Sequence, residues 1–442
     1  MSDLDPTRRY FSPEIETMPR AEIERRRDER LLGDLLPWAY ERSALIRHTW
    51  DVAGIKPADI TSMDDFREQV PFIDKDTIRA FRDEHHDPYG GLLCLDPSDP
   101  TMKKIFSAIF STSGTTGDPT PAPYAGRGPS FLVREFWELG CRPGDHFLHC
   151  LFTFRGPGIH DTVRGVGATP VFVDHQPEDV PQLFRFSRDL RPTGWYTLSG
   201  PLVMMIEAAA ADLGESLEET FKSYRGVVFA GEPIGPRARR RVESWGLELF
   251  IQTGLGDVGA ATECAQHDGC HYWEDTAFIE HLDPDGTTPA GDGERGELVS
   301  TTLIDKIAPL VRYRSDDIVR RTVEPCACGR THGRIWPLGR KSDEVVVQGI
   351  SVLPGDIWAA VEQLPETEAG LFQVIRERRE VDVLRLRVGY ASEGPRGLAD
   401  LQTRVTDSVH AAVGVAPDVE LVENAVLLRQ GPPHKIPRVT RT

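Results

Sequence analysis

Long apolar runs are missing from this sequence. No stretch of the 442 residues reaches the roughly 18–20 apolar residues that a membrane-spanning helix needs. The start, Met1-Ser2-Asp3-Leu4-Asp5, also lacks a basic segment followed by an apolar one, so no secretory signal is expected. We therefore expect a cytoplasmic protein with no membrane partner.

Positive charge is scarce relative to negative charge. Lys and Arg number 51 against 69 Asp and Glu, which gives a net charge of −18. Such a surface repels polyanions, so we expect no nucleic-acid partner. A small anionic ligand remains compatible, because a local site can oppose the field of the whole molecule.

Cysteine is also limited, and seven cysteines in a cytoplasmic chain do not predict a disulfide framework. Four of them group with one histidine in two short stretches. Cys and His at such spacings can complete a tetrahedral zinc site. Cys270 is an alternative to the histidine as fourth ligand, and free buried thiols are the alternative to a metal. The predicted structural Zn²⁺ ligands are Cys264, His271, Cys326 and Cys328.

The chain is too long for one ordinary core, so at least two domains are expected. From residue 104 to 250, short apolar runs alternate with helical stretches, which predicts an α/β sheet with covering helices. Further strands are expected at 295–302 and 311–320. Residues 21–54 predict two helices broken near Pro37. The individual strands between 104 and 250 are expected at 171–173, 195–197 and 227–229, with a helix at 201–213.

The character of the sequence changes after Arg340. A strand at 345–347, a helix at 354–364, and helical spacing from Leu398 to Val409 indicate a compact α+β unit of about 100 residues. We therefore expect a large N-terminal domain over 1–340 and a small C-terminal domain over 341–442.

A polar loop follows the apolar run 105–110. Its glycines allow close approach to a phosphate, and its hydroxyls and N–H groups can donate to phosphate oxygens. It is not a Walker motif, because the Gly-Lys-Ser/Thr ending is absent. A polar surface turn is the alternative interpretation. The candidate phosphate-binding residues are Ser111, Thr112, Ser113, Gly114, Thr115, Thr116 and Gly117.

This loop resembles the phosphate-binding signature of the adenylate-forming superfamily, although Asp118 stands where many members carry Lys. Further stretches resemble the signatures of that superfamily in the same order. They imply an adenine-contacting turn, a Mg²⁺ carboxylate at Asp257, a ribose-binding Asp317, and a hinge at which Arg340 contacts the nucleotide. Asp257 replaces the usual Glu and Thr253 the usual Tyr; a helix N-cap is the alternative role for Asp257. The remaining implied nucleotide residues are Gly231, Glu232, Pro233 and Gly254.

The two ends and the start of the small domain resemble phenylacetate–CoA ligases in particular. The stretches are 10–17, 349–354 and 431–439. The last contains Lys435, which the resemblance implies is catalytic for adenylation. A solvated tail lysine is the alternative.

The resemblance implies ATP-dependent activation of an aryl or arylacetic acid as its acyl-adenylate, with Mg²⁺, and then thioester formation with CoA. Phe154, Gly156 and His160 are expected to line the acid pocket. Transfer to a carrier-protein thiol or an amine is an alternative, and a non-catalytic nucleotide- and acid-binding relic is a second one. A homodimer is the expected assembly.

Overall fold

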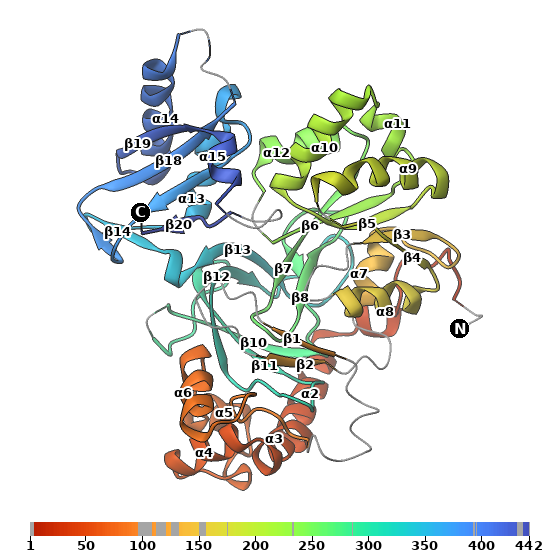
Figure 1. Cartoon of the computed structure of the whole chain (residues 1–442). Coiled ribbons are helices and arrows are strands. Elements are labelled where there is room, and N and C mark those ends of the chain that lie inside the picture. The colour runs from red at the N-terminus through yellow and green to blue at the C-terminus, as the bar shows by residue number, and fades with distance from the viewer. Residues whose placement is uncertain are drawn as a thin grey trace.

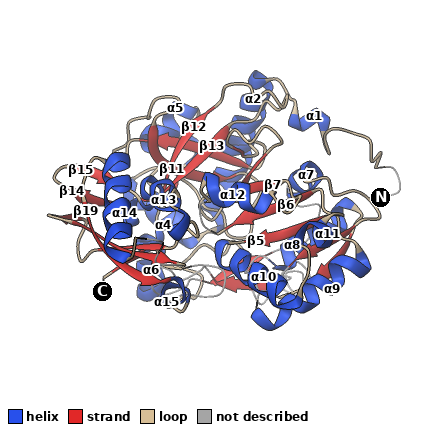
Figure 2. Ribbon diagram, turned by 90° about the horizontal axis from the view of Figure 1, so that it is seen from above, coloured by secondary structure: helices blue, strands red, loops and turns tan. Residues whose placement is uncertain are grey.

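The computed structural model describes residues 4–95, 108–111, 121–124, 132–149, 156–174, 176–231, 234–284, 286–391, 394, 396–430 and 436–441. An eleven-stranded mixed sheet is built from strands between His146 and Arg340, in the order β10-β11-β12-β13-β9-β8-β7-β6-β5-β3-β4. Helices cover both ends of this sheet (Figures 1 and 2). The α/β fold expected from the sequence is confirmed.

One half of the large sheet is parallel and carries the helices expected between its strands. Buried Trp195, Val227 and Leu249 lie on adjacent strands and pack against the helices on one face. The strands are β3 (His146–His149), β4 (Thr169–Phe172), β5 (Gly194–Leu198), β6 (Gly226–Ala230) and β7 (Leu249–Gly254). The helices are α7 (Leu132–Glu138), α8 (Gly156–Val166), α9 (Val180–Leu190), α10 (Gly200–Leu213), α11 (Leu217–Phe221) and α12 (Pro236–Glu243).

The other half of the sheet is antiparallel and continues from β7. Its strands are β8 (Ala260–Glu263), β9 (Cys270–His271), β10 (Ala277–Leu282), β11 (Arg295–Thr302), β12 (Tyr313–Thr322) and β13 (Arg334–Arg340). A separate antiparallel pair, β1 (Ala108–Ser111) and β2 (Pro121–Tyr124), flanks the sequence of the predicted phosphate loop.

The N-terminal helices pack on β10 and the segment before β12, through contacts that include Phe278 and Val311. The break expected near Pro37 is wrong. Residues 20–42 are helical throughout: a π turn (Leu31–Leu35) joins α2 to α3 directly before Pro37, and this local widening of the helix accommodates the N–H that proline lacks. The break lies at Ser43, whose Oγ accepts from the Ile46 amide at 3.2 Å. The helices are α1 (Pro13–Glu16), α2 (Arg20–Arg30), a π turn (Leu31–Leu35), α3 (Leu36–Arg42), α4 (Ala44–Ala53), α5 (Met63–Gln69) and α6 (Lys75–His85).

Residues after Arg340 build two sheets of their own around one apolar core. The first sheet has the order β15-β14-β17 and the second β19-β18-β16-β20. This unit stands beside α12 and α10 in Figure 1. Its elements are β14 (Val345–Val347), β15 (Ile350–Val352), α13 (Pro354–Glu362), β16 (Phe372–Ile375), β17 (Glu380–Val381), β18 (Leu384–Tyr390), α14 (Leu398–Val413), β19 (Pro417–Glu423), α15 (Asn424–Leu428) and β20 (Val439–Thr440).

We compared the described helices with the length and apolar character that a membrane-spanning helix needs. Within the described ranges, every helix is too short or too polar to cross a bilayer.

Candidate functional site

Three side chains that the sequence assigned to the nucleotide motifs, Asp257, Asp317 and Arg340, meet a fourth, Tyr313, where β12 and β13 pass the turn after β7. Asp317 and Arg340 are direct partners in the β12–β13 register, and Arg340 Nε lies 3.7 Å from Asp317 Oδ1. The hydroxyl of Tyr313, on β12, donates to Asp257 Oδ2 at 3.0 Å. The antiparallel pairing therefore brings together two carboxylates, a phenol and a guanidinium from segments as far apart in sequence as Asp257 and Arg340.

Within this group the phenol of Tyr313 is the hydrogen-bond donor, and the carboxylates of Asp257 and Asp317 are the acceptors. Burial raises the pKa of Tyr313, and the neighbouring Asp257 carboxylate raises it further, so the phenol stays protonated and donates. Burial also raises the pKa of Asp317, while Arg340 opposes the shift. The pair Asp257 and Asp317 can offer oxygen ligands or hydrogen-bond acceptors, the groups that bind a hard cation or ribose hydroxyls.

The backbone around Asp257 excludes the helix-capping alternative. No helix follows it; β8 begins at Ala260. Gly256 holds the tight turn, because it has a positive φ of 58° and a Cβ there would lie 2.8 Å from Ser315 Cβ. Asp257 is thereby pressed against β12 rather than placed at a helix start.

Several predicted site residues lie outside the described residues, and the structure gives the positions only of those beside them. Ser111 ends β1 opposite Pro121 of β2, and Gly231 follows the end of β6. Thr253 and Gly254 close β7, one turn before Asp257. The residues outside the described ranges are Thr112, Ser113, Gly114, Thr115, Thr116, Gly117, Phe154, Glu232, Pro233 and Lys435.

Gly156 and His160, both predicted to line the acid pocket, are the first and fifth residues of α8. The His160 ring stacks on Phe172 with centroids 5.6 Å apart, and His149 lies against the same phenyl ring. β3 and β4, which carry these neighbours, are separated from β7 by β5 and β6. The structure therefore does not bring His160 into the group around Asp257.

A second group, the cysteine cluster, consists of Cys264, His271, Cys326 and Cys328. All four side chains are buried, and their ligand atoms lie within 4.8 Å of one another. Cys264 Sγ is 3.8 Å from Cys326 Sγ, and Cys328 Sγ is 3.4 Å from His271 Nε2. Three sulfurs and one imidazole nitrogen at these separations match the donor set of a closed tetrahedral site.

The surroundings orient the cluster's donor atoms. His271 Nδ1 lies 3.1 Å from the His332 carbonyl, which leaves Nε2 to face the sulfurs. The amides of Cys328 and Arg330 point at Cys326 Sγ (3.5 Å) and Cys328 Sγ (3.4 Å), a polarity that suits thiolates. Cys270 is excluded as a member: its Sγ lies 3.6 Å from the Ile251 carbonyl, within a different apolar group.

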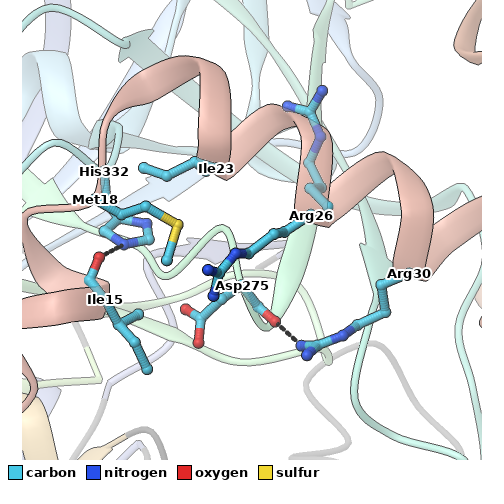
Figure 3. Close-up of a pocket in the computed structure, with 8 residues that line it drawn as sticks. Ile15, Met18, Ile23, Arg26, Arg30, Asp275 and His332 are labelled. Carbon is cyan, nitrogen blue, oxygen red and sulfur yellow. Dashed lines mark hydrogen bonds between the residues drawn. The ribbon is translucent and has the colours of Figure 1, made fainter.

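The N-terminal segment closes over the turn that carries Cys326 and Cys328. Tyr10 Oη donates to the Cys328 carbonyl at 2.6 Å, and Arg330 Nε donates to the fully buried Glu16 at 2.9 Å. A cavity of about 90 Å³ lies beside this junction. Figure 3 shows residues that line it, among them His332, whose Nε2 contacts the Ile15 carbonyl. This packing has no signal in the sequence, because no local pattern relates Glu16 to a residue 314 positions away.

Comparison with known proteins finds several curated relatives along most of the chain. It is 30% identical to a phenylacetate–coenzyme A ligase of Thermus thermophilus over 392 residues, which covers 86% of this chain and 84% of the relative. It is 28% identical to the Escherichia coli enzyme of that name, covering 92% of both chains. An L-proline–[L-prolyl-carrier protein] ligase of Pseudomonas fluorescens shares 25% identity over 64% of this chain and 57% of the relative. No protein-family model matches the chain.

The solved structures similar to this one include two states of a single enzyme. A 2-hydroxyisobutyryl-CoA ligase in its postadenylation state, with 2-HIB-AMP bound, is matched at a TM-score of 0.86 and 25% identity, over 100% of this chain and 94% of the other. The same ligase in its thioesterification state, with 2-HIB-AMP and CoA, is matched over the same shares at 0.69 and 26% identity. Coverage and identity barely differ between the two matches, so the higher TM-score means that the chain superposes better on the postadenylation structure than on the thioesterification structure.

Proposed function

This chain belongs to the phenylacetate–CoA ligase family, and from that premise we propose that it activates an aryl or arylacetic acid with ATP and transfers the acyl group to CoA. A carboxylate oxygen attacks the α-phosphorus of ATP, and the bond to pyrophosphate breaks. The CoA thiolate then attacks the acyl carbon of the acyl-adenylate, and AMP leaves. Carboxylate activation is needed because a carboxylate alone is a poor electrophile.

The grouping of Asp257, Tyr313, Asp317 and Arg340 carries this proposal. In it, Asp317 accepts from the ribose hydroxyls, Arg340 contacts the nucleotide, and Asp257 holds Mg²⁺ directly or through water. Little covalent chemistry is asked of the protein, so positioning and charge neutralisation supply the rate. The predicted loop 111–117 and turn 231–233 complete the nucleotide site in the proposal.

Residues 341–442 act in this proposal as a small mobile domain that serves both half-reactions. The chain superposes better on one of two states of the 2-hydroxyisobutyryl-CoA ligase than on the other, and this difference supports a mobile role for residues 341–442. A carrier-protein thiol is the alternative acceptor, favoured only by the weaker likeness to the L-prolyl-carrier protein ligase. A homodimer and a cytoplasmic location belong to the same proposal; light scattering of the purified protein tests the first and cell fractionation the second.

A panel of acids tests the substrate class. Benzoic, arylacetic, heteroaryl, short hydroxy and long-chain fatty acids are offered singly with ATP and Mg²⁺, and pyrophosphate release is measured. We expect the aryl or arylacetic acids to give turnover at least about tenfold above the fatty acids, a difference of about 1.4 kcal/mol in transition-state binding. Turnover confined to fatty acids would show the aryl assignment to be wrong.

Removing the charge of Asp257 tests its assignment to Mg²⁺. Asp257→Asn keeps the shape and the contact with Tyr313 but weakens a metal ligand. We expect adenylation to fall about 10²-fold or more at low Mg²⁺, with part of the loss recovered as Mg²⁺ rises. Asp268→Asn, on a turn where the carboxylate pairs with Arg334, is the control and should behave as the parent. A parental rate for Asp257→Asn across the Mg²⁺ titration would remove the metal role.

We also propose that the cysteine cluster holds one structural Zn²⁺. The fit rests on three observations: the Cys₃His donor set, the orientation of His271 by His332, and amides directed at two sulfurs. All four ligand positions are protein atoms and are buried, so such a site leaves no open position for substrate. The metal would join the turn after β8 to the approach to β13, beneath the N-terminal segment.

A further inference from the structure

Helix α12 begins directly after the turn predicted to lie against the adenine ring, and its first turn lacks a cap from its own segment. The N-cap residue is Gly235, which has no side chain to accept from the helix amides. Pro236 removes one of the free N–H groups, so the amides at the next two positions still need an acceptor.

The acceptor comes from the small domain. Glu362, the last residue of α13, is 2% exposed, and its Oε1 accepts from the Arg237 amide at 2.7 Å. Figures 1 and 2 both show α12 and α13 side by side. A carboxylate at a helix N-terminus is favoured by the helix dipole and by the free amides. Burial raises the pKa of Glu362, and the amides of Arg237 and Ala238 oppose that shift.

A second acid from the small domain strengthens the same contact. Glu368 Oε1 accepts from Arg241 Nη1 at 2.8 Å, and its Oε2 accepts from Arg237 Nε at 3.2 Å. Arg237 Nη1 also donates to the Gln363 carbonyl at 3.0 Å. Arg241 is held in turn by Glu207 of α10 at 2.6 Å. One face of α12 thus binds the small domain through a buried cap and two partly exposed ion pairs.

These contacts belong to one orientation of the small domain. The overall arrangement matches the postadenylation state of the 2-hydroxyisobutyryl-CoA ligase better than its thioesterification state. Turning the small domain relative to α12 would withdraw Glu362 and expose the first turn of α12 to water, so the charge-assisted bond from the Arg237 amide would be lost together with the two ion pairs of Glu368.

We propose that Glu362 and Glu368 form an interdomain latch with the first turn of α12, which holds the small domain in the orientation seen here through acyl-adenylate formation and releases before the thioester step. The two are positioning residues, and their role in the half-reactions rests on the proposed function. Gly235 is part of the latch, because a Cβ there would fall inside the Glu362 carboxylate. Its φ of −83° is open to any residue, so Gly235→Ala displaces a flexible side chain without straining the backbone.

Distance measurement on the full chain tests the latch without relying on activity. Spin labels are attached at Leu213→Cys on α10 and Val383→Cys in the small domain, both about half exposed, whereas the six native cysteines described in the structure are buried. We expect one dominant distance in the parent. Glu362→Ala and Gly235→Ala should each raise a second distance population about tenfold, with Glu362→Gln intermediate because it keeps an acceptor.

The half-reactions supply the second readout. Glu362→Ala and Gly235→Ala should slow adenylation about tenfold, while conversion of supplied acyl-adenylate and CoA to thioester does not slow. Glu366→Gln is the matched control, since Glu366 pairs with Arg404 inside the small domain, and both readouts should stay parental. An unchanged distance distribution in both latch variants overturns the latch, even if the enzyme proves inactive on every acid. An equal loss in both half-reactions also overturns it, because that result indicates a purely structural role.

Discussion

Lys435→Ala should nearly abolish formation of acyl-adenylate from acid and ATP, by about 10²–10³-fold, while leaving thioester formation from supplied acyl-adenylate intact. The acid and the α-phosphate are both anionic and repel each other as they approach. An ammonium between them offsets that repulsion and interacts more strongly as the bridging oxygen forms. Pyrophosphate release and CoA-dependent consumption of the adenylate, measured separately, check the two halves.

The described residues that follow Lys435 argue against a loose tail. Ile436 is fully buried, and Val439 and Thr440 form β20, which pairs with β16 in the small domain. Arg438 Nη1 donates to the Gly370 carbonyl at 2.8 Å, and its guanidinium lies 3.6 Å from the Trp358 ring centroid. The chain immediately beyond Lys435 is therefore held by the sheet that contains β16.

Arg429→Ala is the control for Lys435→Ala, since it removes a tail cation whose guanidinium donates only to the Ala425 carbonyl among its described contacts. Its rates should equal those of the parent. Full adenylation by Lys435→Ala would remove this lysine from the mechanism. Equal loss of both half-reactions would instead indicate misfolding or a wrong hinge.

Cys328→Ser should remove the bound zinc and lower stability sharply. Structural zinc binding provides about 10 kcal/mol or more to a folded site, so losing a ligand should bring down the melting temperature and increase protease cleavage near the N-terminus. That cleavage site follows from the contacts of Arg9, Tyr10 and Glu16 with the turn carrying Cys328. Elemental analysis, thermal melting and limited proteolysis measure the three effects.

Cys270→Ser is the matched control, because Cys270 precedes His271 in the same strand and is equally buried but lies outside the cluster. We expect the control to keep about one zinc per chain, and Cys328→Ser and His271→Ala to lose it. A parent that carries no metal, stays folded after exhaustive chelation and has freely titrating thiols would end the zinc proposal.

Short-range sequence patterns predicted several strands and one long helix of the fold. Apolar runs gave the strands β5, β6, β11 and β12, and the stretch 201–213 coincides closely with α10. The break at Pro37 was misplaced because the helix continues past the proline through the π turn Leu31–Leu35, and no local sequence pattern marks such a turn. The short β20 escaped prediction because two residues carry no periodicity, and its place is set by pairing with β16.

Motif order predicted the group of Asp257, Asp317 and Arg340, and the structure then added Tyr313 as the donor that holds Asp257. The choice between Cys270 and His271 could not be made from spacing, since adjacent residues in a strand face opposite sides. Glu362, Arg237 and Glu368 gave no sequence signal, because a cap supplied by another domain leaves no pattern beside the helix that it caps.

One measurement bears most directly on the assignment as an acid–CoA ligase: mass spectrometry of products from purified protein, an aryl or arylacetic acid, ATP, Mg²⁺ and CoA. The predicted result is acyl-CoA and AMP in equal amounts, with acyl-adenylate accumulating only when CoA is left out. Formation of adenylate that never passes to CoA would contradict the acceptor, and the absence of both adenylate and AMP with every acid would contradict the enzymatic assignment.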